Sequence, residues 1–383
     1  MSRLPRELLN AIVVAGTVTG CRDDLVCLAL TCKHFNELVE PVLWREWICL
    51  FTDDVIEMHA KISERPSLAR HVHSLTLAYQ WFEMEDYSTY LNRAIKTLET
   101  IVGVDDIPGL VCGRLVALLH ATRPHLRTLD MKYVAWASRM HKDMAPSIGQ
   151  LENLTSLRLE HIRDDIHGSL RVLTQLRARL EHFAIVSFRE WSIHPFLIIQ
   201  NSQDTLKTVC FCKGELPPLH DDPLIWPNLV SLRLDQVKMD IHTVEAAFPN
   251  LRQLSYMMCH GGEILNHTSD AWPKLEIIHT HHAPGQLRFL YPVEILDTDY
   301  ICTYDTFDPV LLSMVNNCRP VKLRLVLSSD SPFEQTHPSF IASRLEILDV
   351  QLNGRLFLEC DLVADVWVRE MLHTAQTGSN YST

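Results

Sequence analysis

Apolar residues recur along most of the chain in the spacing apolar-x-x-apolar-x-apolar, which is typical of a short strand with one buried face. From Leu126 to Leu275, successive copies of this pattern begin roughly 20 to 30 residues apart, a period that indicates stacked structural repeats. The copies begin at Val72, Leu126, Leu154, Leu180, Leu206, Leu229, Leu251, Leu275 and Leu345.

Proline marks the same phase of the repeat, two residues before a core leucine, where it is expected to end the preceding helix. It does so at Pro124, Pro227, Pro249 and Pro273. Between the strand-like cores, helical spacing is found at 166–176, 241–248 and 310–315. Strand followed by helix, repeated, predicts an α/β solenoid over residues 51–360, with parallel strands on its concave face and helices on its convex face.

Two intervals in the series are longer than one period. The interval 72–126 is about twice as long as one period, so it leaves room for two repeats. The interval 275–345 is about three times as long and leaves room for three. In the second interval, candidate strands of weaker pattern lie near 295–300 and 318–323.

A capping helix and a disordered tail are predicted for residues 361–383. Leu362 and Val366 form an apolar i,i+4 pair, as do Val363 and Trp367. A helix built on these pairs would shield the last repeat from solvent.

The first 50 residues differ from the rest because their apolar spacing is helical throughout. Pro5 suits a first helical position, and Leu8 and Ile12 stand one turn apart on the same face. Residues 1–50 are therefore predicted to form a small helical domain of their own.

A second helix is predicted within this domain. Leu25, Leu28 and Cys32 recur with helical spacing, and Asp23 can cap the N-terminus of the helix. Pro41 is expected to break or kink the helical pattern. A unit this small buries only a modest core, so we expect it to be marginally stable unless it docks on something larger.

Three landmarks stand in order in this segment: Leu4-Pro5, Cys32-Lys33 and Leu43-Trp44. Together they resemble an F-box, although the loop at 15–22 is longer than the usual connection in that family. The resemblance implies that one side of the segment binds a Skp-type adaptor and the other packs against a substrate-binding domain. The matching positions, which would bind the adaptor, are Leu4, Pro5, Leu8, Ile12, Leu25, Leu28, Cys32, Lys33 and Trp44.

With the repeats that follow, the whole chain resembles the F-box/leucine-rich-repeat family, in the divergent form abundant in fungi. The resemblance implies a substrate-recognition subunit of a Skp/cullin/F-box E3 ubiquitin ligase. The F-box would bind the adaptor, and through it a cullin, while the repeats would bind an unidentified protein target. Two alternatives stay open: a leucine-rich-repeat scaffold without ligase association, and a metal-dependent hydrolase.

In such a solenoid, the side chains between the core leucines would point out from the concave sheet, because strand side chains alternate. They form two columns that are charged at both ends and apolar at 184–186 and 210–212. This apolar middle could dock a target, or adjoining loops and a helix at 195–199 could cover it. The residues expected to bind the target are Arg158, Val186, Cys210, Cys212, Arg233, Asp235, Met257, His279 and His281.

The strongest signal for an enzyme is the pair His279 and His281, because two imidazoles on one strand face can begin a metal site. A metal needs further ligands, and neither an HExxH sequence nor a carboxylate at motif spacing accompanies the pair. The nucleophile elbow GxSxG and the phosphate loop GxxxxGK[ST] are also absent from the sequence. We therefore expect no catalytic site, no metal and no cofactor.

The composition limits the kinds of partner and the cellular compartment that we expect for this protein. The net charge is −12 and the basic residues are dispersed, which argues against nucleic acid as a partner. The eleven cysteines are scattered without a CxxC pair, which favours a reducing compartment. No signal peptide and no apolar run long enough to span a membrane is evident. We expect a cytoplasmic or nuclear protein that does not bind membranes.

Overall fold

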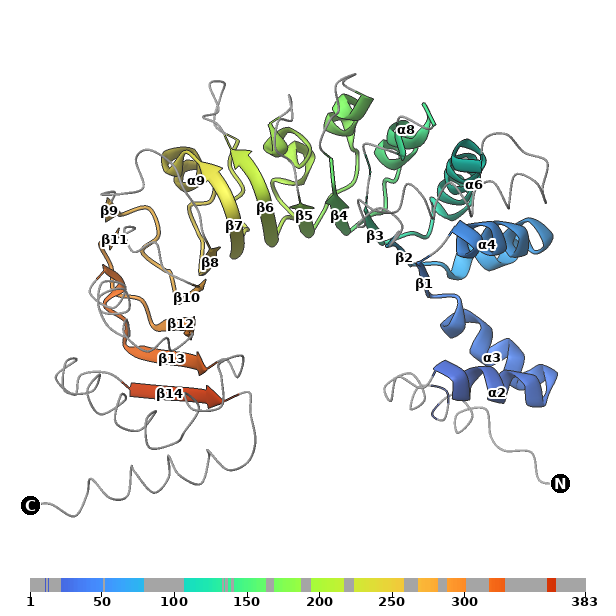
Figure 1. Ribbon diagram of the computed structural model, residues 1–383, viewed down its shortest axis with the longest axis horizontal. Coiled ribbons are helices and arrows are strands. Elements are labelled where there is room, and N and C mark those ends of the chain that lie inside the picture. The colour runs from blue at the N-terminus through green and yellow to red at the C-terminus, as the bar shows by residue number, and fades with distance from the viewer. Residues whose placement is uncertain are drawn as a thin grey trace, which may run out of the picture. The chain divides into compact units, whose positions relative to one another are not determined.

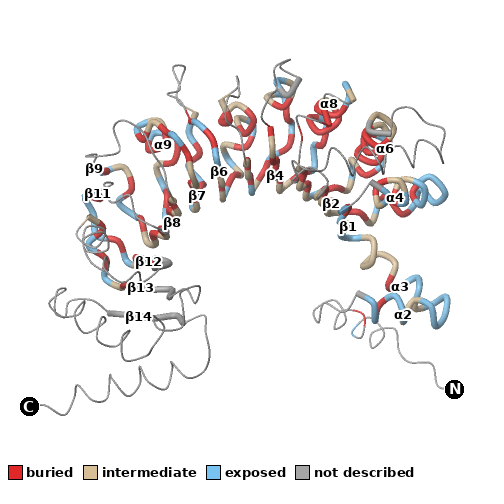
Figure 2. The backbone as a smooth tube through the Cα atoms, in the orientation of Figure 1, coloured by how far each residue is buried: buried red, intermediate tan, exposed pale blue. Residues whose placement is uncertain are grey.

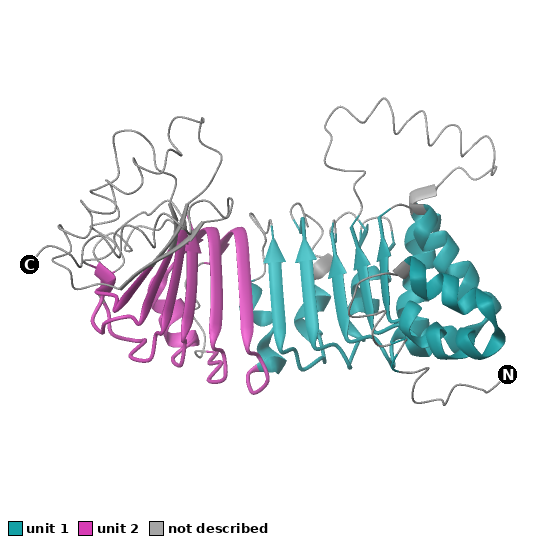
Figure 3. Ribbon diagram, turned by 90° about the horizontal axis from the view of Figure 1, so that it is seen from below, with its two compact units in different colours: residues 1–202 teal, residues 203–383 magenta. Residues whose placement is uncertain are grey.

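A computed structural model describes residues 22–50, 52–78, 107–132, 141–162, 169–186, 194–216, 224–257, 268–281, 288–300, 317–327 and 357–362, with single positions at 11, 13, 134, 137 and 138. The chain divides into two compact units, residues 1–202 and residues 203–383 (Figure 3). Both units combine parallel strands with helices, so the fold class is α/β, as predicted.

The elements of the first unit alternate between strands and helices or 3-10 turns after an opening pair of helices (Figure 1). They are α2 (Arg22–Thr31), α3 (Lys33–Leu43), β1 (Glu46–Cys49), α4 (Thr52–Glu64), η1 (Pro66–His71), β2 (Ser74–Leu77), α6 (Ile107–Thr122), β3 (Thr128–Met131), α8 (Met144–Gly149), β4 (Ser156–Glu160), η4 (Ser169–Gln175), β5 (His182–Val186), η5 (Pro195–Leu197) and η6 (Gln200–Ser202).

The second unit is richer in strands. Its elements are β6 (Thr208–Leu216), β7 (Ser231–Met239), α9 (Ile241–Ala247), β8 (Gln253–Met257), β9 (Thr268–Ser269), β10 (Ile277–His281), β11 (Arg288–Phe289), β12 (Ile295–Tyr300), β13 (Lys322–Leu327) and β14 (Phe357–Leu362).

Within each unit, successive repeats place equivalent residues side by side in parallel register. In the first unit Leu129 aligns with Leu157 and Leu157 with Phe183. In the second unit Leu232 aligns with Leu254. These side chains are buried. In Figure 2, buried positions, in red, recur along the repeats of both units. The apolar-x-x-apolar-x-apolar pattern therefore forms the core of both units, as the sequence predicted.

In the first unit, α4, α6 and α8 lie on one side of the strands and stack on one another in chain order, α4 on α6 and α6 on α8 (Figure 1). The opposite side carries the strand residues that alternate with the core positions. We call this side the open face of each unit. It corresponds to the surface that the sequence predicted to be concave.

Backbone hydrogen bonds connect each repeat to the next at the start of its strand. The N–H groups of Thr155 and Ser156 both donate to the carbonyl of Arg127, at 2.8 and 3.0 Å. In the second unit, the N–H groups of Arg252 and Gln253 donate to the carbonyl of Val230 in the same way. Each repeat is thus held by its neighbour, as expected of stacked repeats.

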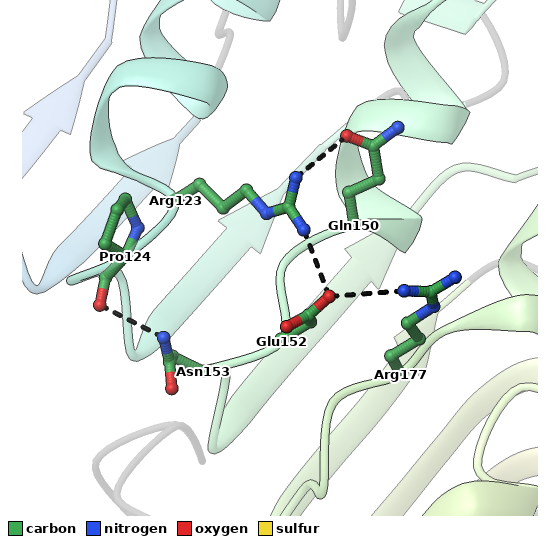
Figure 4. Close-up of polar contacts among 6 residues, drawn as sticks. All are labelled: Arg123, Pro124, Gln150, Glu152, Asn153 and Arg177. Carbon is green, nitrogen blue, oxygen red and sulfur yellow. Dashed lines mark hydrogen bonds and ion pairs between the residues drawn. The ribbon is translucent and has the colours of Figure 1, made fainter.

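Asparagine side chains add a second connection, which the sequence analysis missed. Asn153 Nδ2 donates to the carbonyl of Pro124 at 3.1 Å (Figure 4). In the second unit, Asn228 and Asn250 donate to carbonyls of the preceding repeat at 2.7 and 3.0 Å. Each asparagine directly precedes a core leucine, so the signal was present in the sequence.

A charged network lies beside the first of these asparagines (Figure 4). Arg123 donates to Gln150 at 3.3 Å and to Glu152 at 3.0 Å. Arg177, from the following repeat, donates to the same oxygen of Glu152 at 3.4 Å. Glu152 therefore links three successive repeats, although its exposure limits the stabilisation.

The opening helices break at a different place from the one predicted. Cys32 adopts an extended conformation, with φ −163° and ψ 159°, and separates α2 from α3. Pro41 lies inside α3, and the N–H of Trp44 still donates to the carbonyl of Glu40 at 3.1 Å. Because Pro41 is close to the helix end, the single hydrogen bond that it removes does not end the helix.

The sheet of the first unit starts before residue 50. β1 pairs with β2, and Glu46 aligns with Ser74. The strand–helix architecture thus reaches into the segment 1–50, which was predicted to be helical only. Within the described residues, the helical part consists of α2 and α3, with Val13 packed against them.

Direct strand pairing corrects the repeat count in the first of the two long intervals. β2 pairs with β3, so 72–126 contains one repeat and not two. In the second interval, the candidate strand at 295–300 is confirmed as β12. The candidate near 318–323 overlaps a strand only at its end, because β13 spans Lys322–Leu327. β13 pairs directly with β14, and the copy predicted to begin at Leu345 lies outside the described residues.

The other predicted helices have mixed outcomes. The helix at 241–248 is confirmed as α9, whereas 166–176 contains the 3-10 helix η4. The prediction of a C-terminal helix is wrong at its start, because Leu362 is the last residue of strand β14. The rest of that helix, and the one at 310–315, lie outside the described residues.

Candidate functional site

A cluster of four charged side chains occupies the open face of the first unit, on β3, β4 and the residue after β3. Arg158 Nε donates to Glu160 Oε1 at 2.7 Å and lies 3.8 Å from Asp130 Oδ1. Lys132 Nζ lies 3.8 Å from the other carboxylate oxygen of Glu160. We call these four residues the charged cluster.

Burial within the charged cluster differs from the prediction. Strand alternation from Arg158 predicts that Glu160 is exposed, but it is buried, because Arg158 and Lys132 cover its carboxylate. Burial also raises the pKa of Asp130, and Arg158 opposes that shift only in part. The Oδ1 atom of Asp130 is buried and accepts no hydrogen bond. Arg158, whose side chain is 45% exposed, is the member most available to a partner.

The same open face becomes less polar on β5. Ala184 aligns with Arg158, and Val186 aligns with Glu160. Both are half-buried, so Val186 offers a partner only part of its surface. The segment 195–199, which was considered as a cover for the apolar middle, forms the turn η5 and buries Phe196 and Ile199 in the first unit.

Two cysteines lie together on β6 in the second unit. Their Sγ atoms are 3.6 Å apart, and Cys210 is half-buried. Cys212 was predicted to be exposed, but only 9% of it is accessible. The hydrogen bond with Cys210, together with burial, raises the pKa of the Cys212 thiol, which therefore stays protonated at neutral pH.

The reason for the burial of Cys212 is local. The next residue, Lys213, has φ 54°, and this left-handed residue interrupts the alternation of the strand. The adjacent residues Phe211 and Cys212 are consequently both buried, whereas regular alternation would expose one of them. Gln236 has φ 53° at the matching place on β7. Uninterrupted alternation along β6 would have left Cys212 on the exposed face, as predicted.

The neighbouring strands of the second unit carry the remaining candidate residues for target binding. Arg233 is exposed, while Asp235 and Met257 are half-buried. Asp235 aligns with Cys212, and its Oδ1 atom is buried without a hydrogen-bond partner. These residues form a mixed surface of charge, thioether and thiol.

His279 and Asp297 form an ion pair or hydrogen bond on adjacent strands of the second unit. His279 Nδ1 lies 3.1 Å from Asp297 Oδ2, and the two residues are aligned in register. The carboxylate is largely covered, whereas 43% of the imidazole side chain is exposed. Of His281 only the backbone position is described, in register with Asp299.

Among side chains in the described ranges, no group of three or more histidine, cysteine, aspartate or glutamate residues is arranged to hold a metal ion. Likewise, none of the helices in those ranges has the length and apolarity required to cross a membrane.

The predicted adaptor-binding residues have different environments on α2 and α3. Leu25 is buried and Leu28 is half-buried, both within the small core of Val13, Leu25 and Val39. Trp44 is half-buried and its ring lies 4.7 Å from that of Trp47. Cys32 and Lys33 are exposed. Leu4, Pro5, Leu8 and Ile12 lie outside the described residues.

Two apolar side chains on α2 were missed as candidate contacts. Leu30 is 80% exposed and Val26, one turn earlier, is 39% exposed. Their i,i+4 spacing was visible in the sequence, but it was not distinguished from that of Leu25 and Leu28, which face the core. We call Val26 and Leu30 the α2 apolar pair.

Comparison of the chain with known proteins finds no family model that matches it and no significant match among curated proteins.

Proposed function

We propose that this protein is a substrate-recognition subunit of a Skp/cullin/F-box E3 ubiquitin ligase. In this proposal, the helical segment of α2 and α3 binds a Skp-type adaptor, and the leucine-rich repeats bind a target protein. The observation that carries the proposal is the α2 apolar pair, in which Leu30 is 80% exposed, at the start of a chain of strand–helix repeats.

The energetics of the helical segment support a docking role. Its core has three buried residues, Val13, Leu25 and Val39, with a few partly buried neighbours. Such a core contributes little net stability after the entropy of ordering two helices is subtracted. Covering Leu30 and Val26 with a partner would remove further apolar area from water, at about 25 cal/mol per Å².

In this proposal, the residues of the F-box-like segment have two different roles. Leu25 and Leu28 hold the helices together, so they act on adaptor binding through the shape of the segment. Leu30, Val26 and Lys33 offer exposed surface for direct contact. Cys32 sets the break between the helices and is also exposed.

The open faces are the proposed target-binding surfaces. On the first unit, Arg158 and Val186 are accessible, and on the second unit Cys210, Arg233, Asp235, Met257 and His279 are at least partly accessible. Cys212 is too buried to make a large contact, and His281 is retained by its strand position only. Polar surfaces with a few partly buried apolar side chains are common in non-obligate protein interfaces.

The proposed contribution to catalysis is proximity. Binding the target and the adaptor at once would raise the effective concentration of a target lysine near a ubiquitin-loaded enzyme held elsewhere in the complex. The chain itself would need no catalytic residue for this role.

Affinity purification from cells, followed by mass spectrometry, tests both halves of the proposal. A Skp-type adaptor and a cullin should co-purify with the parent chain and should be lost with Leu30→Glu. The matched control is Val321→Glu, which changes an apolar residue that is 56% exposed in the second unit. Adaptor recovery that is equal for all three chains would contradict the proposal. Recovery of a target with no adaptor would favour the alternative of a repeat scaffold outside the ligase.

A further inference from the structure

Basic side chains gather at the edge where the first three strands of the first unit begin. Arg45, His73 and Arg127 directly precede β1, β2 and β3. The N–H of His73 donates to the carbonyl of Arg45 at 2.9 Å, and the N–H of Arg127 donates to the carbonyl of His73 at 2.8 Å. The three residues therefore occupy equivalent positions on successive repeats, about 4.8 Å from one to the next.

Further basic residues adjoin this row. His71 and His125 each lie two residues before a member of the row, and Arg70 Nε donates to His71 Nε2 at 3.1 Å. The arginines of the group are exposed and its histidines are half-buried. We call the whole group the basic edge, and its members are Arg45, Arg70, His71, His73, His125 and Arg127.

The side chains of the basic edge lie close enough to influence one another. Burial lowers the pKa of His73, and the charges of Arg45, His125 and Arg127 lower it further. Burial also lowers the pKa of His71. Arg70 adds to that shift, Glu40 opposes it, and the neighbouring histidines contribute least. The edge therefore concentrates positive charge.

This positive charge is not neutralised by the protein itself. Within the described residues, none of the arginines of the basic edge forms an ion pair with a carboxylate. Arg127 donates to the carbonyl of Asn153 at 3.1 Å, a contact that orients its side chain and leaves its charge in place. Glu40, the carboxylate that acts on His71, is already paired with Arg65 at 2.7 Å.

The second unit shows the contrasting arrangement. Arg252 directly precedes β8, as Arg127 precedes β3, and its side chain is 54% exposed. It differs in having a partner, because its Nη1 lies 3.3 Å from Glu276 of the next repeat. An arginine at this position can therefore be neutralised by its neighbour, but those of the basic edge are not.

We propose that the basic edge binds a short acidic segment of a partner protein in an extended conformation. The row from Arg45 to Arg127 spans about 10 Å, which is the length of about three residues of extended chain. Carboxylates on such a segment can pair with the arginines, whose guanidinium groups favour bidentate contacts. The basic edge shares no residue with the α2 apolar pair or the open faces, so the proposal goes beyond the ligase role.

The positions that continue the row favour a peptide over a nucleic acid. The N–H of Thr155 donates to the carbonyl of Arg127, and the N–H of Glu181 donates to the carbonyl of Thr155. The row is thus neutral on the fourth repeat and acidic on the fifth, in a chain whose net charge is −12. A nucleic acid carries negative charge along its whole length and would be repelled there, whereas a short acidic segment ends before it.

The test is fluorescence anisotropy of a labelled glutamate-rich peptide titrated with the purified full-length chain at low ionic strength. The parent should bind saturably, and added salt should weaken binding. Arg45→Gln and Arg127→Gln should each weaken it about three- to fivefold, and together about ten- to twentyfold. The matched control is Arg252→Gln, which removes an arginine from the same repeat position and should leave binding unchanged.

Charge reversal keeps the test decisive even if a variant folds poorly. Arg45→Glu/Arg127→Glu should lose the glutamate-rich peptide and gain binding of a lysine-rich peptide, which a misfolded chain would not do selectively. Equal binding of the glutamate-rich peptide by the parent and by Arg45→Gln/Arg127→Gln would overturn the proposal. Absence of saturable binding by the parent, or tighter binding of single-stranded RNA than of the peptide, would also overturn it. The titration uses no adaptor, so its result is independent of the ligase role.

Discussion

The helical segment of α2 and α3 and the strand–helix repeats are stabilised in different ways. The helices share a core of three buried residues and expose Leu30. The repeats bury leucines in continuous ladders and are joined at each step by paired backbone hydrogen bonds. The repeats can therefore stabilise one another through their neighbours, whereas the helical segment depends on what it docks against.

The surfaces of the helical segment and of the repeats also differ in the kind of partner that each suits. The α2 apolar pair presents exposed apolar area, which suits a permanent partner. The open face of the first unit instead carries the charged cluster, whose members already contact one another. A partner there must compete with existing ion pairs, which suits selective and reversible recognition.

The largest stability effect is expected in the core of the repeats. Phe211 is fully buried on β6, so Phe211→Ala should lower the free energy of unfolding by about 3–5 kcal/mol. Chemical denaturation measures this change. Arg233→Ala, on the exposed side of the next strand, should cost about 0.5 kcal/mol or less. Similar losses for the two variants would remove the distinction between core and open face.

In the helical segment a buried leucine should matter less, and only locally. Leu25→Ala should destabilise α2 and α3 by about 2–3 kcal/mol, because their core is small and can relax. Hydrogen exchange should show faster exchange in 22–43 with little change in β3 to β5. Leu30→Ala is the matched control, since the same truncation at an exposed site should leave exchange unaltered. Uniformly faster exchange through the first unit after Leu25→Ala would mean that the two regions unfold together.

Removing an asparagine hydrogen bond between repeats should have a smaller effect on the free energy of unfolding. Asn228→Ala removes a hydrogen bond to the carbonyl of Asp204 and should cost about 1 kcal/mol. Thermal unfolding measures the shift. Asn36→Ala removes an exposed asparagine of α3 and should have almost no effect. An unchanged melting temperature for Asn228→Ala would show that the asparagine connection does not stabilise the repeats.

The smallest effect on stability is expected from a change of pH, which acts on histidines near the junction of the helical segment and the repeats. Arg114 lies 3.3 Å from His59 Nδ1, and Arg70 donates to His71 Nε2 at 3.1 Å. Burial, with the adjacent arginine second, lowers the pKa of each histidine below its ordinary value. The unfolded chain therefore binds protons more readily than the folded one, and stability falls as the pH drops through about 6.5.

Denaturation between about pH 7.5 and about pH 5.5 tests this sign. The parent should be less stable at the lower pH, and His59→Gln/His71→Gln should reduce the dependence. His71 belongs to η1, which contacts α3, and Arg65 pairs with Glu40 at the same junction. A pH dependence that the double variant leaves intact would assign the effect to other groups.

The sequence predicted the repeat fold well because the signal is periodic. Leucines at fixed spacing, with proline two residues earlier, located the strands from β2 to β8 and the helix α9. Spacing could not tell a long repeat from two short ones, as in 72–126, because a helix such as α6 can fill the interval. The spacing also did not predict the left-handed backbone at His161, Lys213 and Gln236, because these non-glycine residues carry no clear sequence signal for that conformation.

The candidate surfaces were predictable only in part. Alternation correctly placed Arg158 and Arg233 on the exposed side of their strands. It failed for Glu160, which two cations cover, and for Cys212, which precedes a left-handed residue. The neighbours His279 and Asp297 come from strands whose pairing a single sequence does not reveal. Burial by distant residues, and register between strands, are properties of the assembled sheet.

Direct binding of a purified Skp-type adaptor to the full chain, and to a chain lacking residues 1–43, tests the central claim most directly. The deletion stops before Arg45, whose carbonyl accepts from the N–H groups of His73 and Ser74, so that β1 and its contacts remain. We expect saturable one-to-one binding by the full chain and none by the shortened one, which should stay folded. Equal binding by both chains, or none by either, would contradict the assignment of adaptor recognition to the helical segment.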